Sequence, residues 1–223
     1  MSWTDKHILI TGGTGGLGPA VVEAFVARGA TVHVPAKGPL PRGALALPAV
    51  DVTDEAAVVA LFASLPPLWA SIHLVGGFTM KGIADTSLAD VQAQLTLNFA
   101  SAFLCTREAT KNMRAAGKGG RIVNMGSRSV DVDPPAMMSS YSAAKAAVIA
   151  MSRAVAAEVR KDGILVNVVA PTLFDTAANR KMMPDAAHDR WQKPAQIAET
   201  IVWLASAENE VTTGSVLRVS GTD

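Results

Sequence analysis

Tyr141 and Lys145 form a pair that could carry out proton transfer, because they lie four residues apart in the stretch YSAAK. On a helix, residues at this spacing share a face. A free phenol has a pKa near ~10, and a neighbouring ammonium group stabilises the phenolate and lowers that pKa. The phenol then becomes a usable acid or base near neutral pH. An isolated pair of this kind is also common on helix surfaces, so its place in the fold must decide.

Two further polar side chains lie where they could assist this pair. Ser127 follows GRIVNM, an apolar run typical of a strand that ends in a small polar turn. Ligands gather at the carboxyl ends of strands in a doubly wound sheet, so the Ser127 hydroxyl could face a substrate oxygen, with Ser129 as the second choice. Asn98 interrupts an apolar helical stretch. A buried asparagine needs partners, so its amide could hold a backbone group or a water beside Lys145.

The stretch ILITGGTGGLGP at residues 8–19 places a glycine-rich turn between an apolar run and an amphipathic helical pattern. Such a turn directs backbone N–H groups and the positive end of the helix dipole toward a bound phosphate. Two known glycine patterns fit. The first uses Gly13, Gly15 and Gly18, and the second uses Gly12, Gly16 and Gly18. The spacing alone does not choose between them, and a tight turn without a ligand also fits.

Short apolar runs alternate with longer helical patterns along the whole chain. We expect strands at 6–11, 31–35, 47–51, 71–76, 120–125, 164–170 and 215–219. Helical patterns lie between them at about 18–28, 54–64, 87–115, 139–161 and 194–206. The alternation predicts one α/β domain over residues 1–223. Its expected architecture is a doubly wound parallel sheet of the Rossmann type, with about seven strands and helices on both faces.

Two segments lack a clear periodic pattern. Residues 36–46 are rich in glycine and proline and are expected to form a loop. Residues 172–193 are expected to form a flap over the site, where Met182, Met183 and Trp191 offer adaptable apolar contacts.

Composition excludes several classes of function. The net charge is +1, so nucleic acid and anionic membranes are not expected partners. The single cysteine, Cys105, lies in an apolar helical pattern and reads as a small buried side chain rather than a nucleophile. The histidines show no metal-ligand spacing, so no metal is expected. The sequence has no basic leader and no apolar run of about 18 residues, so we expect a cytoplasmic protein.

Taken together, these motifs resemble those of the short-chain dehydrogenase/reductase family over essentially the whole chain. The resemblance is carried by TGGTGGLG, DVTD at 51–54, LNFASAF, Ser127 after IVNMG, YSAAK and NVVAPTLFDT at 167–176. It implies an oxidoreductase that transfers hydride between a nicotinamide and a carbonyl or alcohol. Tyr141 would be the acid/base, Ser127 would orient the carbonyl, Lys145 would lower the Tyr141 pKa and hold the ribose, and Asn98 would support a proton relay.

The resemblance also implies the second glycine pattern and a wider set of cofactor contacts, which Tyr141 and Lys145 would share. These are Gly12, Thr14, Gly16, Leu17, Gly18, Asp51, Val52, Gly76, Gly77, Pro171 and Thr176. An acidic residue about 20 positions beyond the glycines would bind the ribose of NAD. The sequence there reads VPAKGPL, without Asp or Glu, and Lys37 could attract a 2′-phosphate. We therefore expect NADP(H), with NAD(H) as the alternative.

The sequence departs from the family pattern at two places. LVGGF replaces the usual Asn-Asn-Ala-Gly run, and Pro171 is followed by Thr172 instead of glycine. The VGGF run and the segment after it also resemble dihydropteridine reductases and a set of bacterial short-chain reductases. The pteridine enzymes lack the serine, so Ser127 favours a carbonyl or alcohol substrate. A quinonoid pterin is the second reading, and a non-catalytic cofactor-binding protein is the third.

The helical pattern at 139–161 is apolar on much of its surface. One face must cover the sheet, and the remaining alanine-rich face would suit close packing against another subunit. The family resemblance points the same way, so we expect a homodimer or homotetramer that acts on a small molecule.

Overall fold

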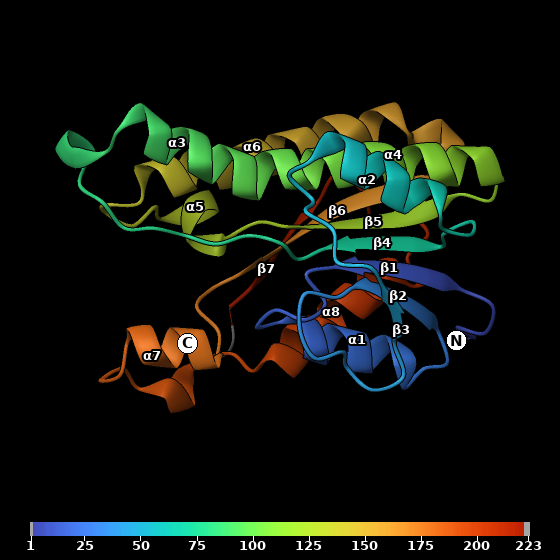
Figure 1. Ribbon diagram of the computed structural model, residues 1–223, viewed down its shortest axis with the longest axis horizontal. Helices are drawn as coiled ribbons and strands as arrows, with labels where there is room; N and C mark the ends of the chain where they lie inside the picture. The colour runs from blue at the N-terminus through green and yellow to red at the C-terminus, as the bar shows by residue number, and fades with distance from the viewer. Residues whose placement is uncertain (1, 221–223) are drawn as a thin grey trace.

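Within residues 2–220, which the computed structural model describes, seven parallel strands form one sheet in the order β3-β2-β1-β4-β5-β6-β7 (Figure 1). The strands are β1 His7–Thr11, β2 Thr31–Pro35, β3 Leu45–Leu47, β4 Ala70–His73, β5 Gly120–Met125, β6 Ile164–Pro171 and β7 Val216–Val219. The chain runs outward from β1 to β3 and then returns to β4 on the other side of β1. This reversal confirms the doubly wound α/β fold.

Helices cover both faces of the sheet. Figure 1 shows α1 Gly18–Val26 and α8 Pro194–Ala205 on one face, with α2 Glu55–Ala63, α4 Ser101–Ala116 and α6 Ser139–Glu158 on the other. Shorter helices lie near the carboxyl ends of the strands. These are α3 Leu88–Gln94, α5 Arg128–Val132 and α7 Ala177–Met182. None of the helices in residues 2–220 has both the length and the apolar character needed to cross a bilayer.

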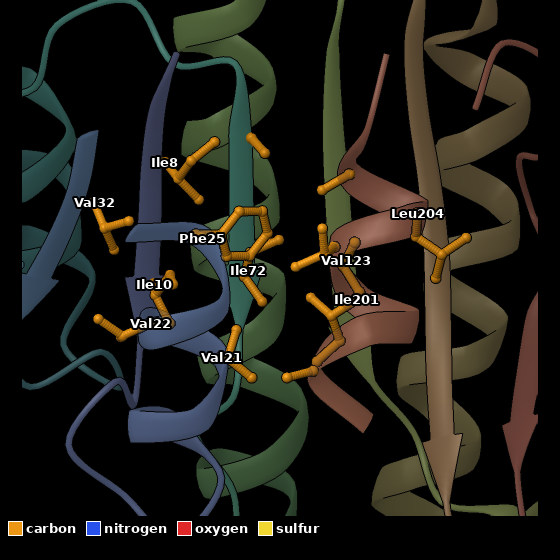
Figure 2. Close-up of a cluster of buried hydrophobic side chains, with 14 of the residues drawn as sticks. Ile8, Ile10, Val21, Val22, Phe25, Val32, Ile72, Val123, Ile201 and Leu204 are labelled. Carbon is orange, nitrogen blue, oxygen red and sulfur yellow. The ribbon is translucent and has the colours of Figure 1, made fainter. Parts of the chain in front are cut away.

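Alternate residues of each strand face different cores. Ile8 and Ile10 of β1 pack against Phe25 of α1 and Ile201 of α8, all fully buried (Figure 2). Leu9 points the other way into a second core with residues of α2, α4 and β6. Because both faces are covered, the strand sequences are almost continuously apolar, as expected for a buried parallel sheet. Full burial of a side chain the size of Phe25 contributes roughly 1.5–3 kcal/mol.

Two strands differ from the sequence prediction by more than one residue at an end. The third strand spans Leu45–Leu47 instead of 47–51, so it begins inside the segment predicted as a loop. Pro48 has no backbone N–H to donate, and this ends the ladder with β2. The fourth strand spans Ala70–His73 instead of 71–76. Residues 74–76 leave the sheet and line a cavity instead.

The helix predicted at 87–115 is interrupted. α3 ends at Gln94, a π-helical turn (η2) covers Leu95–Ala100, and α4 begins at Ser101. Such turns are rare, and they are frequent at functional sites. The Asn98 side chain donates to the Gln94 backbone oxygen over 3.2 Å. Similarly, the helix predicted at 139–161 ends at Glu158 and is followed by a separate 3₁₀ turn, Arg160–Asp162.

Candidate active site

A cavity of about 440 Å³ opens at the carboxyl ends of β1, β2 and β4, where the chain reverses direction across the sheet. Ligands of doubly wound proteins bind at such a point. Most of the predicted cofactor residues line this cavity, namely Gly12, Thr14, Gly16, Leu17, Gly18, Lys37, Asp51, Val52 and Gly76. The other predicted contacts do not line it, namely Gly77, Tyr141, Lys145, Pro171 and Thr176. Pro171 is instead the buried last residue of β6.

The glycine turn requires Gly12 and Gly18 for its own backbone path. Gly12 has φ +78°, a conformation that favours glycine. A Cβ at Gly18 would lie 2.3 Å from the Gly13 carbonyl carbon. Leu17 occupies the N-cap position of α1, where its apolar side chain cannot accept a hydrogen bond. No side chain therefore caps the start of α1, where the Gly18 N–H donates to the Gly15 carbonyl over 3.1 Å and Pro19 has no N–H. The positive end of the helix dipole, beside the glycines of the cavity wall, fits an anionic pyrophosphate.

Thr176 lies against the same turn from the flap side. A Cβ at Gly16 would lie 3.0 Å from its Cγ2 atom, so any side chain there would press against Thr176. The Thr176 hydroxyl accepts a hydrogen bond from the Asn179 backbone N–H over 3.1 Å and caps α7. The predicted nicotinamide contact thus lies within reach of the glycine turn, with its hydroxyl already engaged as a helix cap.

Asp51 is held in a fixed orientation by a neighbour that the motif search missed. Its Oδ1 accepts hydrogen bonds from the Thr53 N–H over 2.9 Å and the Thr53 hydroxyl over 2.7 Å. These bonds, assisted by the charge of Lys37, hold the pKa of Asp51 below its usual value. The D-x-T spacing is typical of an Asx turn and could have identified Thr53. The cavity therefore presents an oriented carboxylate and an ammonium group together.

The catalytic candidates come from three elements that meet beyond Gly76. Ser127 follows β5 and occupies the N-cap position of α5 without a capping hydrogen bond. Tyr141 and Lys145 lie on α6, and Asn98 lies in the π-helical turn. A Cβ at Gly76 would lie 2.7 Å from Asn98 Oδ1 and 3.2 Å from Lys145 Nζ. The cavity wall and the predicted catalytic groups therefore adjoin at Gly76. The absence of a side chain there leaves room for both polar groups.

Asn98 binds the backbone after β4 with both ends of its amide. Its Oδ1 accepts from the Gly77 N–H over 3.2 Å, and its Nδ2 donates to the Gly77 carbonyl over 2.9 Å. The same Nδ2 lies 3.1 Å from the Oε1 of Gln94, a buried residue that the sequence analysis did not single out. Gly77 is thus a support point for the site rather than part of the cavity wall.

Burial controls the two titratable groups on α6. Burial lowers the pKa of Lys145 from 10.5 to about 8, and its Nζ donates to the Met125 carbonyl over 2.9 Å. Burial also raises the pKa of Tyr141, while a hydrogen bond from Ser127 lowers it. The pKa of Tyr141 thus lies above its ordinary value, because desolvation of the phenol outweighs the hydrogen bond from Ser127.

Phe78 is a further residue of the site that the motifs did not identify. Its ring meets the Tyr141 ring edge-on, with centroids 6.0 Å apart. It is the last residue of LVGGF, the run that departs from the family pattern. That departure was the available signal.

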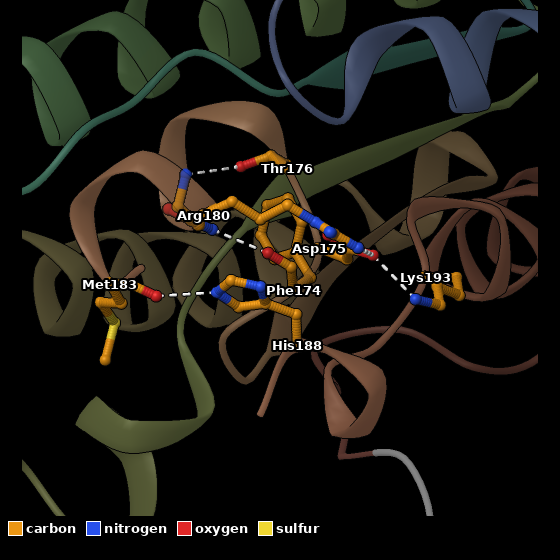
Figure 3. Close-up of polar contacts among 8 residues, drawn as sticks. Phe174, Asp175, Thr176, Arg180, Met183, His188 and Lys193 are labelled. Carbon is orange, nitrogen blue, oxygen red and sulfur yellow. Dashed lines mark hydrogen bonds and ion pairs between the residues drawn. The ribbon is translucent and has the colours of Figure 1, made fainter. Parts of the chain in front are cut away.

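The segment 172–193, which the sequence predicts as a flap, is held together by contacts between its two ends (Figure 3). Phe174 and Gln192 form an isolated parallel bridge. The Asp175 carboxylate forms ion pairs with Arg180 over 2.5 Å and with Lys193 over 2.7 Å. These ion pairs hold the pKa of Asp175 well below its usual range. The flap contains α7 and a 3₁₀ turn, so it is an ordered loop with pinned ends.

Other groups considered for chemistry have structural roles. Cys105 is buried, and burial raises the pKa of its thiol to about 12. His73 is buried between Ser71 and Asn124, at 2.8 Å and 2.7 Å, and burial lowers its pKa to about 4. Both side chains remain uncharged near neutral pH, as groups of a packed core should.

A sequence model described as short chain dehydrogenase matches residues 6–187. The chain belongs to the short-chain dehydrogenase/reductase family, and this places it among oxidoreductases. It is similar to an uncharacterized short-chain type dehydrogenase/reductase of Sinorhizobium fredii, with 33% identity over 97% of this chain and 43% of the relative. The chain thus spans less than half of that relative. It is also similar to 2,5-dichloro-2,5-cyclohexadiene-1,4-diol dehydrogenase of Sphingobium indicum, with 32% identity over 98% of this chain and 96% of the relative.

Solved structures agree on the fold. A short-chain type dehydrogenase/reductase from Mycobacterium ulcerans has a TM-score of 0.91 at 23% identity, covering 99% of this chain and 90% of that chain. ElxO with NADP bound has a TM-score of 0.87 at 23% identity, covering 97% of each chain. At this level of identity the likeness establishes the single Rossmann-like fold and nothing about substrates.

Proposed function

We propose that this protein is an NADP(H)-dependent oxidoreductase that interconverts a carbonyl compound and its alcohol, with Tyr141 as the acid/base. The observation that carries the proposal is the meeting of Asn98 and Lys145 at Gly76, the last glycine of the cavity wall. A dinucleotide in the cavity would therefore end beside the predicted catalytic groups. Ser127, which contacts Tyr141, supports a carbonyl substrate because it adds a second hydroxyl donor for the substrate oxygen.

Each residue has a role that its contacts support. The nicotinamide, when bound, donates or accepts the hydride. Tyr141 delivers a proton to the substrate oxygen or removes one from it, while Ser127 donates a hydrogen bond to the same oxygen. Lys145 keeps an ammonium group next to the ribose position. Asn98 holds the backbone at Gly77, so that the adjoining cavity wall keeps its shape.

The preference for NADP(H) rests on the charges lining the cavity. Lys37 lies in the wall beyond β2, where NAD-binding proteins carry an acidic residue. Its ammonium group would pair with a 2′-phosphate. Asp51 lies in the same wall, with its carboxylate oriented by Thr53. We assign Asp51 to the adenine amino group, as a hydrogen-bond acceptor. The NADP bound to ElxO, a protein of the same fold, is consistent with this choice.

The first experiment is a titration of the purified protein with NADPH and NADH, followed by nicotinamide fluorescence. NADPH should bind more tightly, and Lys37→Ala should remove most of that preference without weakening NADH. As a matched control, Lys118→Ala removes an exposed lysine outside the cavity and should change neither affinity. Equal weakening of both cofactors in Lys37→Ala would contradict the assignment of the 2′-phosphate.

The second experiment tests the chemistry. A panel of ketones, aldehydes and a quinonoid dihydropterin is tested with the preferred cofactor. Tyr141→Phe should abolish most turnover on the carbonyl substrate and leave cofactor affinity unchanged. Faster turnover of the dihydropterin than of every carbonyl compound would favour the pteridine reading. Cofactor binding without turnover of any compound would favour a non-catalytic role.

Self-association is part of the proposal. Ala143, Ala146 and Ala150 are exposed along one side of α6, and small side chains allow close approach of a second helix. We propose a homodimer or homotetramer that packs through this face. Light scattering of the wild type and of Ala146→Arg should show loss of the oligomer in the variant, and an unchanged mass would refute this interface.

A further inference from the structure

Ser129, which lies outside the predicted catalytic set, contacts the serine within it. The Oγ atoms of Ser127 and Ser129 are 2.9 Å apart, a hydrogen-bonding distance at which either could be the donor. Ser127 is 7% exposed, whereas Ser129 is half-buried. Ser127 also interacts with the Tyr141 phenol closely enough to lower its pKa. Three hydroxyl groups therefore follow one another from Tyr141 through Ser127 to Ser129.

The number of hydrogens on a serine hydroxyl decides which of the two serines must be the donor. A serine hydroxyl has one hydrogen to donate and two lone pairs to accept with. If Ser127 donated to Ser129, it would have no hydrogen left for a phenolate or a substrate oxygen. If Ser129 donates instead, Ser127 keeps its hydrogen for the reacting groups. Each hydrogen bond in such a row also polarises the next one.

The local structure fixes Ser129 where this requires. Ser127 is the N-cap of α5 with an extended backbone, so the helix begins at the next residue. The Ser129 carbonyl accepts from the Asp133 N–H over 2.9 Å, which closes the turn. Asp131 of the same helix pairs with Arg218 of β7 over 2.7 Å. The short helix is therefore attached to the sheet, and Ser129 cannot drift away from Ser127 without breaking these contacts.

We propose that Ser129 is a positioning residue: it donates a hydrogen bond to Ser127 and so directs the Ser127 hydrogen toward Tyr141 and the substrate oxygen. The inference rests on the proposed function, since it assigns Ser129 a part in the same reaction. It acts only through Ser127. The effect of removing Ser129 must therefore disappear when Ser127 is already absent, as expected for groups that form one unit.

The test uses Tyr141, the only tyrosine in the chain, as a reporter. Near-ultraviolet absorbance during an alkaline titration reports the ionisation of this one phenol, without any substrate or cofactor. Far-ultraviolet circular dichroism at each pH shows that the protein is still folded. Lys145, the buried cation on the same helix, is retained in every variant. The proteins compared are wild type, Ser127→Ala, Ser129→Ala, Ser129→Thr and the double alanine variant.

The expected result is a rise of the Tyr141 midpoint in Ser129→Ala, smaller than the rise in Ser127→Ala. The double variant should match Ser127→Ala, and Ser129→Thr should match the wild type because it retains the hydroxyl. With a substrate, Ser129→Ala should lower kcat by about fivefold and leave KM unchanged, the size expected for one lost hydrogen bond.

An unchanged Tyr141 midpoint in Ser129→Ala would overturn the inference. It would also be overturned if Ser129→Ala raised the midpoint by the same amount in the Ser127→Ala background as in the wild type. A midpoint that rises also in Ser129→Thr would overturn it too, since the hydroxyl would then be irrelevant. The titration is independent of turnover. If the midpoints are as expected but the protein reduces no carbonyl compound, the positioning role of Ser129 stands and only the proposed function is rejected.

Discussion

Lys145 should destabilise the folded protein, even though the proposed reaction needs it. Lys145 is 5% exposed, and burial lowers the pKa of its ammonium group from 10.5 to about 8. Each pH unit between two pKa values corresponds to about 1.4 kcal/mol, so this gap corresponds to roughly 3 kcal/mol of lost stability at neutral pH. Lys145→Met removes the charge and keeps the length of the side chain. It also leaves the Met125 carbonyl unpaired, at a cost of about 1 kcal/mol. We expect a net gain of about 2 kcal/mol.

The pH dependence follows from the order of the two pKa values. Below about pH 8 the lysine is charged in both states, and the full cost of burying the charge is present. As the pH rises from about 8 to 10.5, the folded protein carries a neutral amine while the unfolded chain is still protonated. The unfolded chain then binds more protons, so stability rises with pH. Above 10.5 the cost has vanished, and so should the advantage of Lys145→Met.

Urea unfolding followed by tryptophan fluorescence measures this difference, because the chain contains four tryptophans. Wild type and Lys145→Met are compared at about pH 7 and about pH 10. Lys118→Met removes an exposed lysine as the matched control and should stay within about 0.5 kcal/mol of the wild type. A Lys145→Met protein that is less stable than wild type at neutral pH, or whose advantage does not shrink on raising the pH, would refute the reasoning.

Three further outcomes are expected. Gly76→Ala should reduce turnover at least ~10-fold by crowding the catalytic groups, whereas Gly38→Ala, in the same cavity wall but with open space around it, should resemble wild type; equal kinetics of the two variants would contradict the geometry. Cys105 should resist a thiol reagent until urea unfolds the protein, since its pKa is about 12, and rapid labelling of the native state would count against its burial. Asp175→Asn should speed tryptic cleavage inside the flap with little change in Tm, whereas the exposed Asp185→Asn should not; identical digestion rates would show that the ion pairs do not restrain the flap.

Sequence periodicity located the strands and helices that bury apolar side chains on both faces of the sheet. Periodicity could not place the ends of strands and helices where a single polar side chain or backbone group sets them. Pro48 ends the third strand earlier than the apolar pattern suggested. The π-helical turn around Asn98 was hidden, because one inserted residue hardly changes the apolar period. Its signal was Asn98 itself, a polar side chain in an apolar stretch.

The site shows a similar division. Residue spacing indicated the glycine turn and Lys37, and the family resemblance indicated Asp51. All of them line one cavity in the structure. Thr53 and Phe78 were recognised only from their contacts with Asp51 and Tyr141, although the D-x-T spacing and the LVGGF run were signals for them. The sign of the Tyr141 pKa change was also beyond the sequence. Spacing places an ammonium group nearby, but the extent of burial, which dominates here, depends on the whole surrounding fold.

The flap described above enters and leaves the protein at nearly the same place. Thr172 of one end contacts Gln192 of the other through their side chains over 3.2 Å. Replacing the residues between Thr172 and Gln192 with a segment of another length costs little chain entropy, because these two positions already lie side by side. The segment can therefore be exchanged as a cassette. Substrate range could diversify here through changes in length and composition, while the sheet, the glycine turn and the proton-transfer residues are inherited without alteration.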